Sequence, residues 1–177
     1  MSAVRVLSTA EVPAAELAAS RRLMDAAFDD FTDHDWTHAL GGWHAIIGRA
    51  DDIVAHAAVV PRVIVVGGRD FHAGYVEAVA VRPDLQGTGL GSRVMVAIND
   101  VVRARFALGV LSTGEWRFYE RLGWERWQGP AFVRGGDRVL TRADDEDDGV
   151  MVLRVAASAT LDLAAPIACD ERDGDSW

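Results

Sequence analysis

Gln86-Gly87-Thr88-Gly89-Leu90-Gly91 is the stretch that decides the fold, because an apolar strand precedes it and an amphipathic helix follows it. Residues 75–81 (YVEAVAV) are mostly apolar and rich in valine, which predicts a short buried strand that Pro83 ends. From Leu90 to Phe106, apolar residues recur at helical spacing. A strand, a glycine-rich turn and a helix N-terminus together predict an anion site, since backbone N–H groups and the helix dipole favour negative charge.

Two common phosphate-binding motifs do not match this stretch. A dinucleotide-binding fold has G-x-G-x-x-G in its first strand-to-helix turn and an acidic residue about 20 positions further on. Here the glycines alternate as G-x-G-x-G in the middle of the chain, and the acidic residue downstream, Asp100, is too close. A nucleotide P-loop needs Gly-Lys-Ser/Thr, and the chain contains no lysine. The glycines alone also allow a tight turn that binds no ligand.

The longer pattern Val-x-Pro-x-x-Gln-Gly-x-Gly-x-Gly, from Val81 to Gly91, resembles the acetyl-coenzyme A signature of the GNAT N-acetyltransferase superfamily. The resemblance implies acetyl-CoA as co-substrate, with the backbone amides of residues 86–91 holding its pyrophosphate. It also implies that the preceding strand edge pairs with the pantetheine arm as if with an added strand. The implied cofactor-binding residues are Val79, Ala80, Val81, Gln86, Gly87, Thr88, Gly89, Leu90 and Gly91.

Composition predicts one ordinary globular domain over residues 1–177, since 50% of the residues are apolar and 25% are charged. Glu11, Pro13 and Glu16 interrupt the apolar core that a signal peptide needs, and no apolar run approaches the ~20 residues of a membrane span. The single cysteine, Cys169, excludes an internal disulfide and fits a reducing compartment. We therefore expect a cytoplasmic protein without a membrane segment.

Negative charge concentrates in the last fifth of the chain. From Asp144 onward there are ten acidic residues and two arginines, which supplies −8 of the net charge of −9. We therefore expect no nucleic-acid partner, because a protein that binds nucleic acid needs a basic face to neutralise the phosphates. The acidic run Asp144–Asp148 is either a solvated loop or a rim that attracts cations.

The rest of the chain predicts alternating helices and strands. Ser8-Thr9-Ala10-Glu11 is a candidate capping box for a helix that extends to Phe28, and Gly123 is expected to end a short helix over residues 115–122. Two paired strands are expected at residues 44–48 and 53–66, joined by a turn at residues 49–52, and further strands at residues 107–111, 124–133 and 150–155. A loop with a short helix is expected over residues 29–43. This order predicts an α/β (α+β) fold with a mixed, mostly antiparallel sheet flanked by helices, which matches the acetyltransferase architecture.

Direct attack of an amine on a thioester needs a proton acceptor, a carbonyl polariser and a proton donor for the thiolate. Glu77 is the only charged residue of the strand before the glycine turn, and we predict it to be the general base. A place on a solvated strand face is the alternative for Glu77. Resemblance to the superfamily implies that Tyr119 protonates the thiolate and that the backbone N–H of Val79 polarises the carbonyl. Packing alone is the alternative for Tyr119.

Covalent and metal-dependent chemistry fit the sequence less well. Cys169 lies in the acidic tail, and no histidine partner for a nucleophilic cysteine is discernible. The histidines show neither H-x-x-E-H nor another metal-ligand spacing, so no metal site is predicted. They are His34, His38, His44, His56 and His72.

Beyond the glycine turn, the chain resembles a narrower family, the aminoglycoside 2′-N-acetyltransferases. The segments that carry this resemblance include residues 30–42 (DFTDHDWTHALGG), 56–59 (HAAV), 74–81, 147–149 (DDG) and 169–177. The resemblance implies acetyl transfer to the 2′-amine of aminoglycosides, and hence antibiotic resistance, by a homodimer. It also implies contacts to sugar amines and hydroxyls from Asp30, Asp35, Glu77, Ala78, Ser112, Glu146, Asp147, Asp175 and the α-carboxylate of Trp177, whose indole would pack against the site and fix that carboxylate.

Charge favours this substrate class independently of the resemblance. An aminoglycoside carries several ammonium groups, and carboxylates from three distant segments acting on one polycation bind it together and raise its encounter rate. The same chemistry on a polyamine, a cell-envelope amino sugar or a protein N-terminus would use the same carboxylates. A non-catalytic coenzyme A sensor and an interaction module built on the acidic tail are alternatives from other classes.

Overall fold

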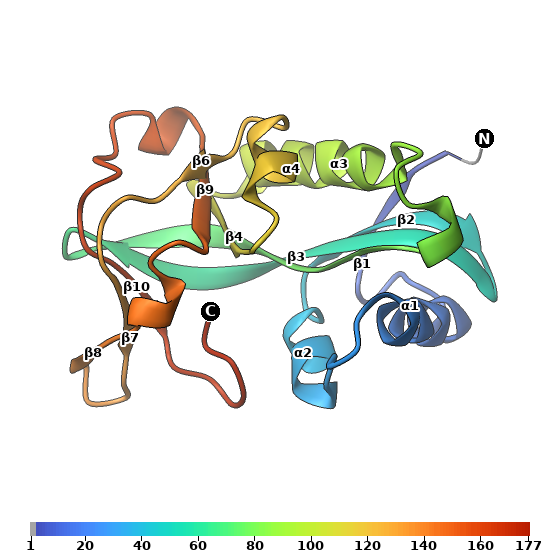
Figure 1. Ribbon diagram of the computed structural model, residues 1–177, viewed down its shortest axis with the longest axis horizontal. Coiled ribbons are helices and arrows are strands. Elements are labelled where there is room, and N and C mark those ends of the chain that lie inside the picture. The colour runs from blue at the N-terminus through green and yellow to red at the C-terminus, as the bar shows by residue number, and fades with distance from the viewer. Residues whose placement is uncertain (1–2) are drawn as a thin grey trace. The chain divides into compact units, whose positions relative to one another are not determined.

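The computed structural model describes residues 3–177, within which the chain forms four α-helices and ten strands (Figure 1). The helices are α1 (Ala14–Ala27), α2 (Asp33–His38), α3 (Leu90–Arg105) and α4 (Trp116–Glu120). The strands are β1 (Arg5–Ser8), β2 (Trp43–Arg49), β3 (Asp52–Val66), β4 (Arg69–Val81), β5 (Leu108–Ser112), β6 (Glu125–Arg126), β7 (Ala131–Arg134), β8 (Leu140–Arg142), β9 (Val150–Arg154) and β10 (Ile167–Asp170). Short 3₁₀ turns occupy Pro83–Leu85, Asp144–Glu146 and Ala156–Ser158.

The strands hydrogen-bond in the order β6-β9-β5-β4-β3-β10-β7-β8, and β1 and β2 extend the ladder beside β3. β4 runs parallel to β5, and β10 runs parallel to β7. The pairs β1–β2, β2–β3, β3–β10, β5–β9, β6–β9 and β7–β8 are antiparallel. This mixed, mostly antiparallel sheet with flanking helices confirms the predicted α+β class.

The chain divides into two compact units, and β3 and β4 run through both of them. Unit 1 consists of the described residues up to Val60 together with Val76–Val101, and unit 2 consists of Pro61–Tyr75 and Val102–Trp177.

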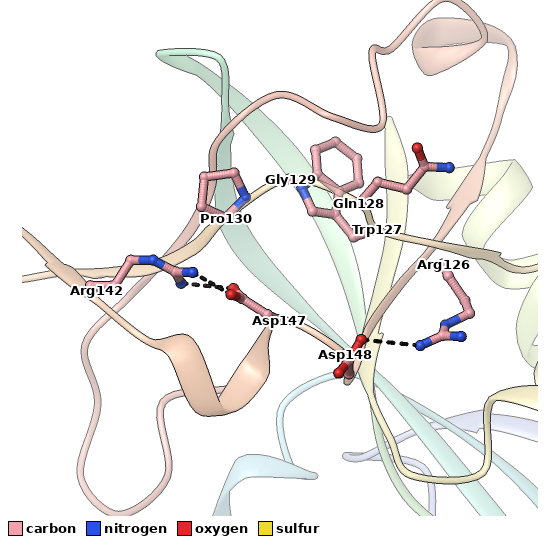
Figure 2. A pocket seen from close by; sticks show the side chains of 8 residues that line it. All are labelled: Arg126, Trp127, Gln128, Gly129, Pro130, Arg142, Asp147 and Asp148. Atoms are coloured by element: carbon pink, nitrogen blue, oxygen red, sulfur yellow. Dashed lines mark hydrogen bonds and ion pairs between the residues drawn. The ribbon is translucent and has the colours of Figure 1, made fainter.

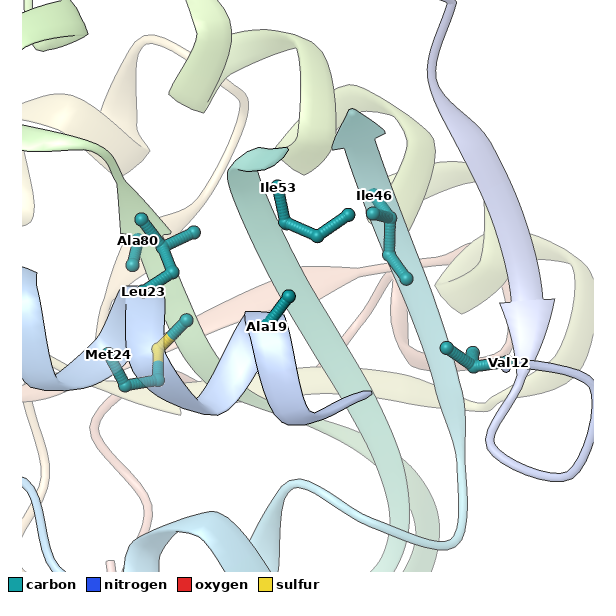
Figure 3. Close-up of a cluster of buried hydrophobic side chains, with 7 residues drawn as sticks. All are labelled: Val12, Ala19, Leu23, Met24, Ile46, Ile53 and Ala80. Atoms are coloured by element: carbon teal, nitrogen blue, oxygen red, sulfur yellow. The ribbon is translucent and has the colours of Figure 1, made fainter. Parts of the chain in front are cut away.

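In unit 1, α1 and α2 lie on one side of the strands and α3 lies on the other (Figure 1). One face of α1 packs on β2, β3 and β4 through a cluster of buried side chains (Figure 3). Met24 and Ile46 in this cluster are fully buried, and burial of each such side chain stabilises the fold by roughly 1.5–3 kcal/mol. Glu16 ties α1 to the strands because it accepts hydrogen bonds from Arg5 Nη2 at 2.7 Å and from the N–H of Ala50 at 3.1 Å.

In unit 2, β5 is the tightly packed centre, with β4 on one side and β9 on the other. Gly109 lies where a Cβ atom would come within 3.0 Å of Leu153 Cβ and of Val102 Cγ1, and within 3.1 Å of the Trp124 ring. A side chain at this position would therefore force these neighbours to move by a few tenths of an ångström. Such close packing fixes the position of β5 and of Ser112 at its end.

The structure corrects two predictions about the N-terminal segment. Residues 5–8 form strand β1, which was not expected, and the helix begins only at Ala14. Ser8 and Glu11 do pair, with Ser8 Oγ donating to Glu11 Oε2 at 2.7 Å, but they close a turn before the helix. Pro13, which lacks an N–H and has a fixed φ, is the residue that precedes the first helical turn.

The predicted strand over residues 124–133 is also wrong, because it is two short strands, β6 and β7, separated by Gly129 and Pro130. A Cβ at Gly129 would lie 2.1 Å from the carbonyl oxygen of Ala165, so the chain passes too close to its neighbour to continue as a regular strand. β8 and β10 were not predicted. The short helix within residues 29–43 and the antiparallel pair β2–β3 are confirmed, and Gly123, with φ of +92°, follows α4 as expected.

None of the helices within residues 3–177 is long and apolar enough to cross a bilayer. Over the same residues, no three or more His, Cys, Asp or Glu side chains come together in an arrangement that could hold a metal ion.

Candidate active site

The glycine turn of unit 1 connects β4 to α3 through one 3₁₀ turn. Gly87 and Gly89 have φ of +76° and +88°, a conformation that glycine adopts without strain. Residues 86–89 are all exposed. Their own side chains brace the turn, since Thr88 Oγ1 donates to the carbonyl of Leu85 at 2.6 Å and Gln86 Nε2 donates to that of Val81 at 3.3 Å.

This turn suits a phosphate-bearing ligand. A Cβ built on Gly87 or Gly89 would meet no atom within 4 Å, so the space outside the main chain is open. The N–H groups of the first turn of α3 have no acceptor within their own helix, and the helix dipole favours an anion there. An open main-chain surface at the start of a 16-residue helix is the donor set that a diphosphate needs.

At the end of β4, Glu77, Ala78 and Val79 are all half-buried. Ala78 has φ of +50°, in the left-handed region that non-glycine residues rarely adopt. Its carbonyl oxygen lies 2.8 Å from Nδ1 of the buried His56. The predicted base, Glu77, and the predicted carbonyl polariser, Val79, thus flank a distorted residue that a buried side chain holds.

Asp30 and Asp35 also belong to unit 1, where Asp30 is exposed. Asp35 already has a structural role, because its Oδ2 accepts hydrogen bonds from the N–H and from Oγ1 of Thr32, each at 2.8 Å. Together with the bond from Asp35 N to Thr32 Oγ1, these contacts form the capping box at the start of α2.

Unit 2 contains an open pocket of about 600 Å³, here named the acidic pocket. Four of the predicted substrate contacts line it: Ser112, Glu146, Asp175 and Trp177. Asp145 and Asp148 add two more carboxylates, and Arg126 is the cation among its lining residues. Arg126 is 3.3 Å from Asp148, so the surplus charge of the pocket is strongly negative.

Glu146 is held inside the acidic pocket by Ser112, whose Oγ donates to Glu146 Oε2 at 2.5 Å. Burial raises the pKa of Glu146, and the charges of Asp175 and Asp145 raise it further, against the lowering effect of the Ser112 hydrogen bond. A bound cation would favour the charged form of Glu146 and so offset the effects of burial and of the neighbouring carboxylates on its pKa.

Two arginines that sequence analysis did not single out hold the C-terminal tail at this pocket. Arg62 donates to the carbonyls of Ser176 at 2.8 Å and Asp170 at 2.9 Å. Arg172 donates from Nε to the carbonyl of Asp175 at 2.7 Å. Both guanidinium groups lie over the ring of Tyr75, at 4.7 and 5.5 Å from its centroid. Trp177, at the end of this tail, is 6% exposed.

Asp147 lies outside the acidic pocket. It lines a second pocket of about 660 Å³, which shares Arg126 and Asp148 with the first (Figure 2). Its carboxylate forms a two-pronged ion pair with Arg142 and accepts from the N–H of Ala131 at 3.2 Å. These contacts lower the pKa of Asp147, the Arg142 hydrogen bond being the largest cause. A ligand ammonium would have to compete with Arg142 for this carboxylate.

Tyr119 lies in α4 of unit 2 and is 8% exposed. It packs edge-on against Phe118 and Trp124, with ring centroids 4.9 and 6.3 Å away. Burial, with a smaller effect of the Glu115 charge, raises the pKa of Tyr119 to about 12. Its hydroxyl is therefore protonated at neutral pH.

The geometry of both units agrees with the comparisons to known proteins. The family model of the acetyltransferase (GNAT) domain matches residues 9–127. An aminoglycoside 2′-N-acetyltransferase from Mycolicibacterium fortuitum is 43% identical over 178 residues, which covers 98% of this chain and 91% of the relative. This chain belongs to the GNAT acetyltransferase family. The family predicted from the sequence is thus confirmed, and the protein is an acyltransferase.

Solved GNAT structures share the fold at low sequence identity. A GNAT family N-acetyltransferase from Escherichia coli in complex with CoA has a TM-score of 0.67 at 19% identity, covering 98% of this chain and 93% of that chain. An acetyltransferase from Brucella melitensis in complex with acetyl-CoA has a TM-score of 0.55 at 20% identity, covering 71% and 84%. A larger neighbour is a probable N-acyltransferase from Enterococcus faecalis, of which this chain covers 33%, with a TM-score of 0.58 at 18% identity over 72% of this chain.

Proposed function

We propose that this GNAT acetyltransferase moves the acetyl group of acetyl-CoA to the 2′-amine of aminoglycosides and thereby confers resistance to them. The single observation that carries the choice of acceptor is the acidic pocket. It presents Asp145, Glu146, Asp148 and Asp175 against one arginine, so it favours a ligand with several positive charges. The name of the 43% identical relative supports the same acceptor.

We assign the acetyl donor to the glycine turn of unit 1. Acetyl-CoA supplies the acetyl thioester, and the main-chain N–H groups of residues 86–91 bind its diphosphate. The strand edge at residues 79–81 aligns the pantetheine arm by main-chain pairing. The open, positive-φ conformation of Gly87 and Gly89 supports this assignment.

The reaction we propose is direct attack of the amine on the thioester carbonyl. Glu77 takes the proton from the acceptor amine, so that nitrogen has a lone pair to form the new C–N bond. The N–H of Val79 donates to the carbonyl oxygen as negative charge develops on it. Tyr119 then donates its hydroxyl proton to the sulfur as the C–S bond breaks, and the second proton, which the nitrogen loses as the amide forms, restores the Tyr119 hydroxyl.

Substrate contacts follow from the same proposal. In unit 2, the carboxylates of Glu146, Asp147 and Asp175 meet ammonium groups, while Ser112 and the α-carboxylate of Trp177 meet sugar hydroxyls or amines. In unit 1, Asp30, Asp35, Glu77 and Ala78 contact the acceptor. Each exposed ion pair contributes only ~0.2–1 kcal/mol, so binding depends on several acting together.

The cellular setting is part of this proposal. We place both units in one acetyltransferase domain that works as a homodimer in the cytoplasm, where acetyl-CoA is available. Light scattering of the purified protein checks the oligomeric state, and a monomeric mass at assay concentration contradicts the dimer.

Thiol release from acetyl-CoA across a panel of amines tests the function. Aminoglycosides with a 2′-NH₂ group should be acetylated, and matched aminoglycosides with a 2′-OH group should not. Spermidine, glucosamine and a peptide with a free N-terminus serve as competing acceptors. If any of these gives a higher kcat/KM than every 2′-amino aminoglycoside, the proposed acceptor is wrong.

A further inference from the structure

Two buried histidines of unit 1 form a continuous hydrogen-bonded chain that ends at the distorted residue of β4. His44 on β2 and His56 on β3 are each 0% exposed. Thr9 Oγ1 is 2.8 Å from His44 Nε2, and His44 Nδ1 is 2.9 Å from His56 Nε2. His56 Nδ1 is 2.8 Å from the carbonyl oxygen of Ala78. No step proposed above uses either histidine.

Both histidines are neutral at neutral pH. Burial lowers the pKa of His44 to about 4. Burial also lowers the pKa of His56 to about 3, with a further contribution from His44 that outweighs the opposing hydrogen bond to Ala78. In a neutral imidazole, one ring nitrogen carries a proton and donates a hydrogen bond, and the other ring nitrogen can only accept one.

The carbonyl of Ala78, at the end of this series of hydrogen bonds, determines which atom donates in each of them. The carbonyl oxygen of Ala78 can only accept, so His56 carries its proton on Nδ1, and its Nε2 accepts from His44 Nδ1–H. The remaining nitrogen of His44 then accepts from the hydroxyl of Thr9, because it is 2.8 Å from Thr9 Oγ1, whereas the competing carbonyl oxygen of Gly42 is 3.3 Å away. Thr9 Oγ1 in turn accepts from the N–H of Gly41 at 2.9 Å. All the donors point the same way, toward Ala78, and each bond polarises the next.

The end of the chain is the peptide unit that joins Ala78 to Val79. The carbonyl of Ala78 and the N–H of Val79 belong to one planar trans group, in which C=O and N–H point in opposite directions. Fixing the oxygen on His56 therefore fixes the direction of the Val79 N–H. A hydrogen bond to the oxygen also draws electron density from the amide and makes its N–H a stronger donor.

The backbone at Ala78 needs such a fixed partner. Its φ of +50° is unfavourable for a residue with a Cβ, and such conformations persist only where surrounding contacts hold them. Trp36 also lies against the His56 ring, at 5.9 Å between centroids, and limits its movement. The buried imidazole is thus a rigid support for a strained turn of β4.

We propose that His56 is a positioning residue for acetyl transfer: through the carbonyl of Ala78 it orients and polarises the Val79 N–H that donates to the thioester oxygen. His44 and Thr9 hold the His56 ring in the required tautomer. The inference rests on the proposed function, in which Val79 N–H is the carbonyl polariser.

The test compares two substitutions at His56 with a control. His56→Leu removes the donor to Ala78, whereas His56→Asn places an amide N–H near the position of Nδ1 and can keep that bond. The kcat of His56→Leu should fall roughly 30- to 100-fold, since a weakened oxyanion donor acts mainly on the transition state. Its KM for acetyl-CoA should stay within about twofold of wild type, and His56→Asn should recover most of the lost kcat.

Leu23→Ala in the α1 cluster is the matched control for lost stability, because it opens a cavity in the same unit without touching the histidines. Urea titration gives the folded fraction of each variant, and the rates are normalised to it. A normalised kcat that is unchanged in His56→Leu overturns the proposal. A kcat that falls equally in His56→Leu and Leu23→Ala shows a merely structural role and also overturns it.

A second readout does not depend on turnover. In ¹⁵N-labelled protein, the Nδ1–H proton of His56 should show a coupling or contact to the Ala78–Val79 peptide, and the Val79 amide shift should move in His56→Leu and return in His56→Asn. An unmoved Val79 amide refutes the positioning role. Wild-type protein that transfers acetyl to none of the panel amines refutes the proposed function instead, so the two failures are distinguishable.

Discussion

At the scale of single residues, the proposed chemistry depends on the two side chains that move protons, Tyr119 and Glu77. Tyr119 is buried, with a pKa raised to about 12, which keeps its proton available at neutral pH. Glu77 is half-buried at the end of β4, next to the left-handed Ala78. A buried neutral phenol and a partly exposed carboxylate are suited to opposite proton transfers.

We expect Glu77→Gln and Tyr119→Phe each to lower kcat by roughly 10²- to 10⁴-fold, because each removes one proton transfer and preserves side-chain size. Steady-state kinetics with saturating acceptor and thermal melting measure the two effects separately. Tyr119→Phe keeps the ring contacts with Phe118 and Trp124, so its melting temperature should stay near that of wild type. Full activity in Tyr119→Phe would identify this residue as a packing residue only.

At the scale of elements, the turn between β4 and α3 couples a backbone conformation to ligand binding. Gly89 has φ of +88° and open space beyond its main chain, so an added methyl group meets no neighbour but forces an unfavourable φ. Gly68, in the hairpin between β3 and β4, has φ of +82° and equally open surroundings. The two glycines are therefore alike in strain and differ in their proposed ligand contact.

We expect Gly89→Ala and Gly68→Ala to lose similar stability, about 1–2 kcal/mol each, because both place a Cβ in the left-handed region. Only Gly89→Ala should raise the KM for acetyl-CoA, by roughly tenfold, since it displaces the amides that hold the diphosphate. Urea unfolding and steady-state kinetics measure these changes. Equal KM values in the two variants would argue against the anion site.

Elements with strong local signals were predictable from the sequence, and short ones were not. The β2–β3 pair and α3 follow from clear apolar patterns. Strands β8 and β10 have three and four residues, and their pairing depends on neighbours far away in sequence, so local patterns carry little information about them. Pro13 was the missed signal for the start of α1, and Gly129-Pro130 was the missed signal for the break between β6 and β7.

The site shows the same division at the scale of the whole molecule. Ser112, Glu146, Asp175 and Trp177 were expected together and do line one pocket. The arginines that hold the tail, Arg62 and Arg172, could not be identified, because an arginine that binds carbonyls looks like any surface arginine in sequence. His44 and His56 had a signal, since each lies among apolar residues of its strand, and polar side chains buried in this way are hydrogen-bonded.

The histidine chain also predicts how the fold responds to acid. In the folded state the pKa is about 4 for His44 and about 3 for His56, whereas a histidine of the unfolded chain has a pKa of about 6.5. At pH values between the folded and the unfolded pKa, the unfolded chain therefore binds more protons than the folded protein. Stability should therefore fall as pH decreases below about 6.5, by roughly 2 kcal/mol per histidine at pH 5. Carboxylates with lowered pKa values, such as Glu16 and Asp170, add their loss only below about pH 4.5.

Urea titrations at pH 7 and pH 5 measure this loss. His56→Asn removes one of the two titrating groups, so its loss of stability between these pH values should be about half that of wild type. An equal loss in both proteins would show that other groups control the acid sensitivity.

The uneven charge of the whole molecule makes a final prediction about substrate capture. The last fifth of the chain carries −8 of the net −9, and the acidic pocket lies within unit 2, which contains this segment. At physiological ionic strength, salt screens the attraction between exposed charges that are more than about 8 Å apart. The KM for a polycationic acceptor should therefore rise roughly fivefold or more between 50 and 300 mM NaCl, at nearly constant kcat. Asp175→Asn should have a higher KM at low salt and a flatter salt response, since one of the attracting charges is gone. A KM that does not respond to salt in wild type would mean that the acceptor is uncharged, and the acidic pocket would then lose its role as the feature that selects the substrate.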